Sequence, residues 1–250
     1  MVWQIGPMAR RVEDLQLLMP MLIGPDGRDH TCVDTPYREA PEIRGLRIAF
    51  FTHNGIAKVT RETAAIVEQS ARALADAGAI VEERTPPGVD QSYDLEMALI
   101  GPDGGDGLRQ YLRDIGSHRT HPLLEGWLQK LEPYRTTLAG FAGCWSRLDQ
   151  FRANFYAFMQ DFDAILSPVS IGPAVPHGMS IDDSVFPGYS YTMTHNLTGY
   201  PAAVVRRGES PEGLPIAVQI ASKPWREDIA LAIASLLDAR AASDSDRPGI

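Results

Sequence analysis

The sequence predicts an α/β fold in which a mixed β-sheet is flanked by helices. Two short apolar runs near the C-terminus, 202–205 and 216–221, lack polar alternation, which is typical of strands buried on both faces. Further strand-like segments lie at 46–51, 79–82 and 162–167. A helix-length segment separates the first two of these, so we expect a right-handed β-α-β unit with parallel strands.

Six segments have the spacing or the end signals of helices: 12–22, 60–77, 94–115, 123–131, 136–160 and 229–237. Thr60 and Gly78 are placed to cap the second of them, whereas Pro20 should kink or end the first. Pro224 should lie in the first turn of the last helix, where a proline removes no helical hydrogen bond. Apolar side chains repeat at helical spacing in this last helix, namely Ile229, Ala232, Ile233, Leu236 and Leu237.

The helix at 136–160 carries an aromatic stripe, and we expect the stripe to lie in the core. Its members share one helix face: Leu148, Phe151, Phe155, Phe158 and Met159.

Three segments are rich in turn-forming or small polar residues. Residues 101–107 (GPDGGDG) interrupt the helix at 94–115. Asp103 and Asp106 and the lack of a P-loop lysine disfavour a phosphate-binding loop, so we interpret this segment as a helix break. Residues 168–188 hold four prolines and should form a loop that walls a pocket. Residues 241–250 should fray.

Composition and charge exclude several classes of protein. The 250 residues, 44% hydrophobic and 22% charged, predict one sizeable core. A net charge of -9 without a long basic run excludes a nucleic-acid surface or an anionic membrane partner. The apolar run 17–23 is too short to span a bilayer. Two cysteines, Cys32 and Cys144, should be reduced thiols, and with no visible signal peptide we expect a cytoplasmic protein.

One stretch, 190–238, resembles the C-terminal end of amidase signature enzymes, with SYTM, AVQ and PW in the order found in their fatty acid amide hydrolase branch. Residues 6–14 (GPMARRVED) resemble the helix that follows the catalytic core of that family. The resemblance implies that residues 1–240 form the C-terminal portion of one amidase signature domain. It also implies hydrolysis of an amide C–N bond through a serine acyl-enzyme, with neither a metal nor an organic cofactor.

The catalytic groups that the resemblance implies are a nucleophilic serine, a bridging serine and a buried lysine. In the family the serines lie in a Gly/Ser-rich block that precedes the helix matched by 6–14, and these 250 residues contain no such block. The lysines, Lys58, Lys130 and Lys223, are each interpreted as solvated charges. We therefore assign no catalytic residue.

Two other constellations are weak. His118 and His121 have a spacing that metal sites use, but no Cys or Glu ligand accompanies them, so no metal site is expected. The pair Asp182 and Asp183 is more typical of a loop cap than of an acid–base dyad, which needs environments that separate the two pKa values.

Part of a substrate pocket can be inferred by the same resemblance. Tyr189, Met193 and Trp225 match positions that line the acyl channel of the fatty acid amide hydrolase branch. Large apolar side chains beside a loop suit an apolar pocket, but ordinary core packing accounts for them equally well. The substrate of the completed site is expected to be a small apolar amide.

Three functions follow as hypotheses. In the first, the chain is the C-terminal segment of an amidase and is inactive alone. In the second, it is a non-catalytic binding or scaffold subunit that completes a partner bearing the family's N-terminal half, or that pairs with a second copy of itself. The third, a nucleotide binder around 46–82, is disfavoured because the turn at 52–57 has one glycine and no G-x-G-x-x-G motif.

Overall fold

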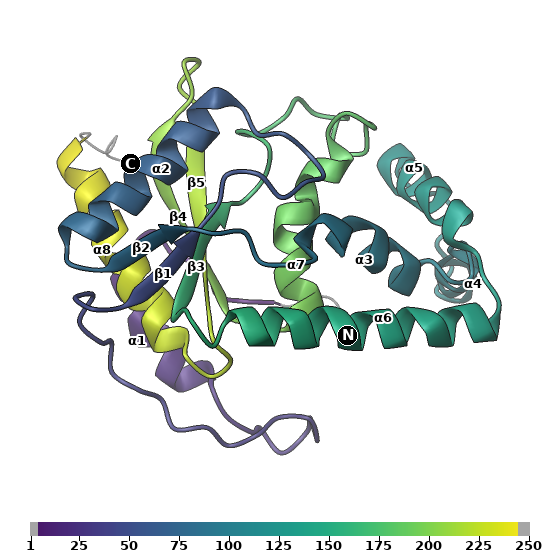
Figure 1. Cartoon of the computed structure of the whole chain (residues 1–250). Coiled ribbons are helices and arrows are strands. Elements are labelled where there is room, and N and C mark those ends of the chain that lie inside the picture. Colours follow the sequence, from purple (N-terminus) through teal and green to yellow (C-terminus); the bar gives the residue numbers. More distant parts are fainter. Residues whose placement is uncertain (1–4, 245–250) are drawn as a thin grey trace.

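A computed structural model of the chain describes residues 5–244, with side chains to residue 240 (Figure 1). In this part of the chain, five strands form one sheet in the order β2-β1-β3-β5-β4. β1 is parallel to β2 and to β3, whereas β5 is antiparallel to β3 and to β4. The predicted mixed sheet and its parallel β-α-β unit are therefore confirmed. The strands are β1 (Arg47–Phe50), β2 (Ile80–Glu83), β3 (Ala164–Pro168), β4 (Ala202–Glu209) and β5 (Pro215–Ser222).

Seven of the eight helices in the described part of the chain lie close to the predicted segments, whereas α7 was not predicted. Thr60 caps α2, since its hydroxyl accepts a hydrogen bond from the Thr63 amide at 3.3 Å. Gly78, with φ 95°, takes the left-handed conformation that ends this helix. α1 ends two residues after Pro20. The helices are α1 (Val12–Leu22), α2 (Arg61–Asp76), α3 (Ser92–Ile100), α4 (Asp106–Asp114), α5 (Pro122–Leu131), α6 (Leu138–Phe158), α7 (Ser190–Thr198) and α8 (Glu227–Asp244), with 3-10 turns η1 (Val89–Gln91), η2 (Glu132–Tyr134) and η3 (Phe186–Tyr189).

The sheet separates two cores, because successive side chains of a strand point to opposite faces. Ile48 and Leu166 face a cluster completed by α2 and α8. Ala49 and Ile165 face a second cluster, to which α6 contributes Phe155. Figure 1 shows α2 and α8 on one side of the sheet and α7 on the other. The central strand β3 is buried along its whole length.

Beyond the sheet, helices pack directly on one another, and α6 extends along this region (Figure 1). One small cluster joins α3, α6 and α7, and a second joins α3, α5 and η3. The aromatic stripe of α6 lies mostly in the core, as predicted, because four of its five members are buried: Leu148, Phe151, Phe155 and Met159.

The expectation for the run 202–205 was wrong. β4 lies at the edge of the sheet and pairs only with β5 among the described strands. One of its edges therefore has no strand beside it. Burial also alternates along the strand, since Val205 is buried whereas Val204, on the opposite face, is 50% exposed. The other run, 216–221, is buried nearly throughout, as expected of a strand with a neighbour on each side.

The expectation for Pro224 was also wrong. Pro224 lies in a turn before α8, which begins three residues later at Glu227. This turn is closed by a hydrogen bond from the Arg226 amide to the Lys223 carbonyl at 3.1 Å. Trp225 has a φ of 64° within it.

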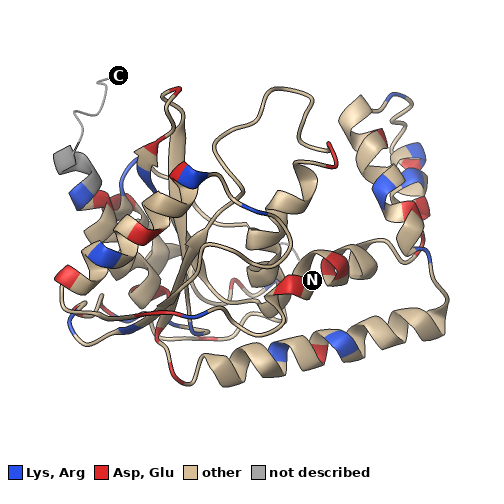
Figure 2. Ribbon diagram, turned by 45° about the horizontal axis from the view of Figure 1, so that its top comes forward, with Lys and Arg blue, Asp and Glu red and all other residues tan. Residues whose placement is uncertain are grey.

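Along the described residues, no helix combines the length and the apolar character that a bilayer crossing requires. α8 continues to Asp244, and the remainder of the segment expected to fray, 245–250, lies outside the described residues. Figure 2 shows acidic and basic residues interspersed along α2 and α6 rather than gathered by sign.

His195 in α7 is a buried histidine whose Nδ1 has no hydrogen-bond partner in the described structure. Its ring packs edge-on against Phe155, with 6.2 Å between ring centroids. Burial disfavours the charged imidazolium and lowers the pKa of His195 to about 4 from 6.5.

We expect His195 to make the protein sensitive to acid. Between pH 6.5 and pH 4, His195 binds a proton in the unfolded state but stays neutral in the folded state. The free energy of unfolding therefore falls as the pH falls through this window. Replacing His195 with Leu removes this proton, and the melting temperature of the variant should decline less than that of the wild type from pH 7 to pH 4.5. His118→Leu, at an exposed position, is the matched control and should follow the wild type. Parallel pH profiles for wild type and His195→Leu would contradict the expectation.

Candidate functional site

A pocket of about 430 Å³ lies between α3, α4, α5, η3 and α7, within the size range of small-molecule sites. Most of its walls are apolar, and three of the lining side chains are aromatic. The lining residues are Glu96, Met97, Ile100, Leu108, Leu124, Trp127, Phe186, Tyr189, Thr192, Met193 and Asn196. We call it the α3–α7 pocket.

Helical spacing places one wall of this pocket. Tyr189, Thr192, Met193 and Asn196 follow one another at i, i+3, i+4 and i+7, which puts them on one face of α7 and its preceding turn. Tyr189 contacts Phe186 edge-on, with 6.0 Å between ring centroids. The predicted role of the proline-rich loop is thus confirmed at its end, where Phe186 lines the pocket.

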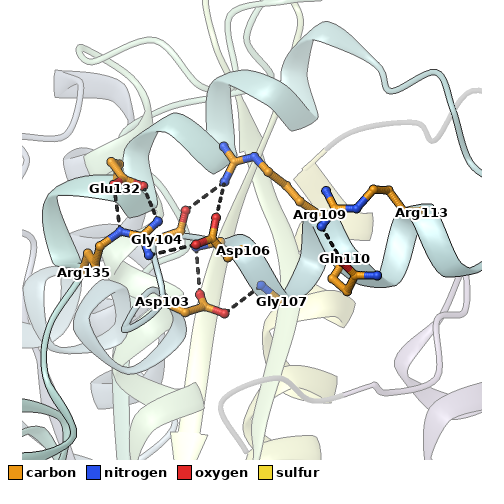
Figure 3. A network of polar contacts seen from close by, with 10 residues as sticks. Asp103, Gly104, Asp106, Gly107, Arg109, Gln110, Arg113, Glu132 and Arg135 are labelled. Atoms are coloured by element: carbon orange, nitrogen blue, oxygen red, sulfur yellow. Dashed lines mark hydrogen bonds and ion pairs between the residues drawn. The ribbon is translucent and has the colours of Figure 1, made fainter.

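The glycine-rich turn 101–107 joins α3 to α4, two of the helices that line the pocket, and its polar contacts are drawn in Figure 3. The Asp103 carboxylate accepts hydrogen bonds from the amides of Gly105 and Gly107, both at 2.8 Å. It thereby occupies the backbone N–H groups that a bound phosphate would need, which supports the interpretation as a helix break. Gly105, with φ 85°, takes a conformation that favours glycine.

An ion-pair network fastens this turn to the segment between α5 and α6 (Figure 3). Arg135 donates to Asp106 at 2.9 Å and to both carboxylate oxygens of Glu132, at 2.8 Å and 3.0 Å. The hydrogen bond from Arg135 lowers the pKa of both carboxyl groups below the usual range. Arg109 adds a hydrogen bond to the Gly104 carbonyl at 3.0 Å.

Glu96 is the one charged residue that lines the pocket. Its residue is 4% exposed, and its Oε2 has no hydrogen-bond partner in the described structure. Burial raises the pKa of Glu96 to about 8, a rise that a hydrogen bond from Asn196 reduces. Glu96 was not predicted from the sequence, although it is the single acid within the apolar run 95–100 (LEMALI), a signal that could have indicated it.

The three pocket residues expected from resemblance do not all lie together. Tyr189 and Met193 line the α3–α7 pocket. Trp225 is 55% exposed and lines a different cavity of about 250 Å³ beside the loop 31–38.

The lysines are not placed for serine activation. Lys58 is exposed, and Lys223 lies 3.7 Å from Asp163. Lys130 departs from the expected solvated charge, since its side chain is only 18% exposed. It pairs with Asp183 and lies 5.5 Å from the centre of the Phe186 ring. Within the described structure, none of the three donates a hydrogen bond to a serine.

The buried serines have other partners. Ser190 accepts a hydrogen bond from the Asn54 side chain at 2.7 Å, and Ser92 donates to the Val89 carbonyl at 2.8 Å. Ser167 lies 3.4 Å from the side-chain nitrogen of Gln219. These contacts join structural elements and supply no general base.

The remaining candidates act as helix and loop caps. His121 accepts a hydrogen bond from the Leu123 amide at 3.2 Å and so caps α5. Asp182 accepts one from the Ser184 amide at 2.9 Å, which confirms it as a loop cap. Over the part of the chain that the structure describes, no three His, Cys, Asp or Glu residues gather as a metal site requires.

Comparison with known proteins gives a consistent result. The family profile described as Amidase matches residues 2–231. An acylamidase of Rhodococcus erythropolis is 26% identical over 94% of this chain and 51% of its own length. A glutamyl-tRNA(Gln) amidotransferase subunit of Thermus thermophilus is 29% identical over 93% of this chain and 54% of its own length. The chain therefore spans about half the length of the curated relatives it matches.

Solved structures support the same fold. A fatty acid amide hydrolase aligns with a TM-score of 0.80 at 23% identity, over 94% of this chain and 48% of that one. A bacterial aryl acylamidase aligns with a TM-score of 0.75 at 22% identity, over 98% of this chain and 55% of that one.

The glycine-rich turn 101–107 gives a testable expectation for the stability of the protein. Replacing Gly105 with Ala should destabilise the protein by about 1–3 kcal/mol, from the left-handed backbone and from crowding. An added Cβ would lie 2.7 Å from a methyl carbon of Leu128. The matched control is Gly143→Ala in α6, where an added Cβ has no heavy atom within 4 Å. This substitution should be neutral or slightly stabilising. Chemical denaturation measures both, and equal effects of the two substitutions would refute this account of the turn.

Proposed function

We propose a function that starts from the family: this chain belongs to the amidase family. In this proposal, the chain binds the substrate in an enzyme that hydrolyses amide C–N bonds. The match to the family over residues 2–231 carries this proposal. The α3–α7 pocket supports it, since its size and its apolar walls suit the acyl or aryl part of a small amide. Tyr189 and Met193 are the residues we propose to contact this part of the substrate.

The reaction requires groups that we do not assign within these 250 residues. In the proposed reaction a serine oxygen attacks the amide carbon, a base accepts the serine proton, and the amine leaves with a proton. Water then hydrolyses the resulting ester. The placement of Lys58, Lys130 and Lys223 supports assigning none of them as the base. We propose that the nucleophile and the base come from the half of the family's domain that this chain does not match.

A hydrolysis assay tests this assignment. The 250-residue chain alone should not release p-nitroaniline from an aliphatic acyl p-nitroanilide above the buffer rate. Together with a polypeptide from the same organism that bears the family's Gly/Ser-rich block and lysine, it should release the product at an enzymatic rate. Hydrolysis by the chain alone that is lost when Ser92, Ser167 or Ser190 is replaced by Ala would contradict the proposal, because it would place the nucleophile in this chain.

A second candidate function is that of a non-catalytic subunit that completes a partner amidase chain. The open edge of β4 favours it. Beside this edge, residues 6–9, α1 and α8 form a largely apolar groove of about 420 Å³ that also includes Val204. From α1 this groove is lined by Leu15 and Met19, which share one face of the helix. An unpaired strand edge next to an apolar groove is a surface that another chain can cover.

Two edge-strand variants test where a partner would bind. Val204→Arg should abolish the complex with the partner polypeptide, because burying an unpaired arginine charge beneath the partner costs free energy. Size-exclusion chromatography measures this complex. Ile80→Arg is the matched control, since Ile80 lies on the opposite edge strand β2 and is 51% exposed, nearly as much as Val204. A complex that survives Val204→Arg, or one that Ile80→Arg disrupts equally, would contradict docking at β4.

A further inference from the structure

The α3–α7 pocket is lined by one acidic residue, Glu96, whose buried carboxyl group lacks a full set of hydrogen-bond partners. Glu96 lies in α3 and is one of the residues that line the pocket. Its residue is 4% exposed, yet Oε2 has no hydrogen-bond partner in the described structure. The Asn196 side chain, one turn beyond Met193, is the polar neighbour that hydrogen-bonds to this carboxyl group.

The unpartnered carboxyl oxygen has no evident structural role. Burial of a polar atom without a hydrogen bond costs free energy, and burial of a charged one costs more. An apolar side chain at this buried position would not carry this cost. A buried polar group that belongs to the lining of a cavity and lacks a hydrogen-bond partner is one that a ligand can satisfy.

The surrounding side chains favour a cation as that ligand. The rings of Trp127, Phe186 and Tyr189 line the same cavity. Aromatic rings attract cations through the negative face of the π-system, and the combination of rings with an acid is suited to an ammonium group. No lysine or arginine lines this pocket. Lys130, near the Phe186 ring, pairs with Asp183 and lines a separate cavity.

We propose that Glu96 is a specificity-determining residue that receives the ammonium group of an amine-bearing apolar amide. The aliphatic or aromatic body of this substrate packs against the apolar walls, and its ammonium N–H groups donate to the Glu96 carboxylate. This inference deepens the proposed function and rests on it in taking the ligand to be a substrate. It adds a substrate class and a named residue that recognises it.

The protonation state of Glu96 is consistent with this role. In the empty pocket, burial raises the pKa of Glu96 to about 8, so the carboxyl group holds a proton at neutral pH. A cation beside the carboxyl group favours its ionised form and releases this proton to the solvent. The uncharged pocket is thus the resting state, and the ion pair forms only with the ligand present.

Binding of three matched small molecules tests the proposal without any need for catalysis. Hexylamine, 1-hexanol and N-hexylacetamide share one alkyl chain, and only the first is a cation at pH 7. Isothermal titration of the full chain should show hexylamine binding at least about tenfold more tightly than the two neutral compounds. Competition by hexylamine against an amine-bearing fluorescent probe provides a second readout.

Variants then assign the preference to one residue. Glu96→Gln keeps the size of the side chain and removes its charge, and it should reduce the preference for hexylamine to about twofold or less. Glu83→Gln, the same chemical change at an exposed position in β2, should leave the preference unchanged. Circular dichroism checks that both variants fold. The wild-type comparison among the three ligands remains decisive should Glu96→Gln fail to fold.

Several outcomes would overturn the proposal: equal binding of the three ligands by the wild type, binding of none of them at millimolar concentration, or a preference that persists in Glu96→Gln. Because the readout is binding, a failure of the hydrolysis assay leaves this inference standing. Hydrolysis of amides without any preference for an amine would overturn this inference and leave the proposed function intact.

Discussion

The position of the pocket depends on the way Tyr191 fixes α7 to the sheet. Its hydroxyl donates to the Ala57 carbonyl at 2.7 Å, and its own carbonyl accepts a hydrogen bond from the Gln219 side chain at 3.2 Å. Its ring stacks near Phe51, with 6.5 Å between centroids. Residues two positions apart on a helix point in nearly opposite directions. Anchoring Tyr191 against the sheet therefore directs Tyr189 and Met193 toward the pocket.

Buried polar side chains extend this anchor to the neighbouring elements. The side-chain nitrogen of Asn54 donates a hydrogen bond to the Ser190 hydroxyl at 2.7 Å. The side-chain oxygen of Asn54 accepts hydrogen bonds from the amides of Ile56 and Ala57. Ser92, at the start of α3, lies 3.3 Å from the Ser190 carbonyl. The Ser92 hydroxyl thus ties α3 to α7, and the Ser190 hydroxyl ties α7 to the loop after β1. This role explains why the chain contains buried serines although none of them has a base beside it.

The parts of the fold that local pattern determines could be predicted from the sequence. The strand at 46–51 and the capped helix that begins after Thr60 follow from apolar spacing and from cap residues, and both are present. The exposure of Val204 could not be predicted, because an edge strand and a central strand of the same composition differ only in which strands lie beside them. The positive φ of Trp225 likewise depends on the turn that precedes α8.

The candidate site was predictable only in part. Resemblance indicated Tyr189 and Met193, which the structure brings together, and Trp225, which it places elsewhere. Glu96 was missed because its burial arises from the packing of α3 against α5, α6 and α7, elements distant in sequence. A charged residue in an apolar helix can point to solvent or to the interior, and local sequence does not distinguish these two cases.

The length of α6 has a consequence for the mechanics of the molecule. Its 21 residues span roughly 31 Å. Its C-terminal end packs beneath the sheet through Phe155, and its middle packs against α3 through Leu148. The helical region at its far end has small apolar clusters of its own, separate from the large cluster between the sheet, α2 and α8. Amide hydrogens of α4 and α5 should therefore exchange through local opening, at a lower free energy than those of β3.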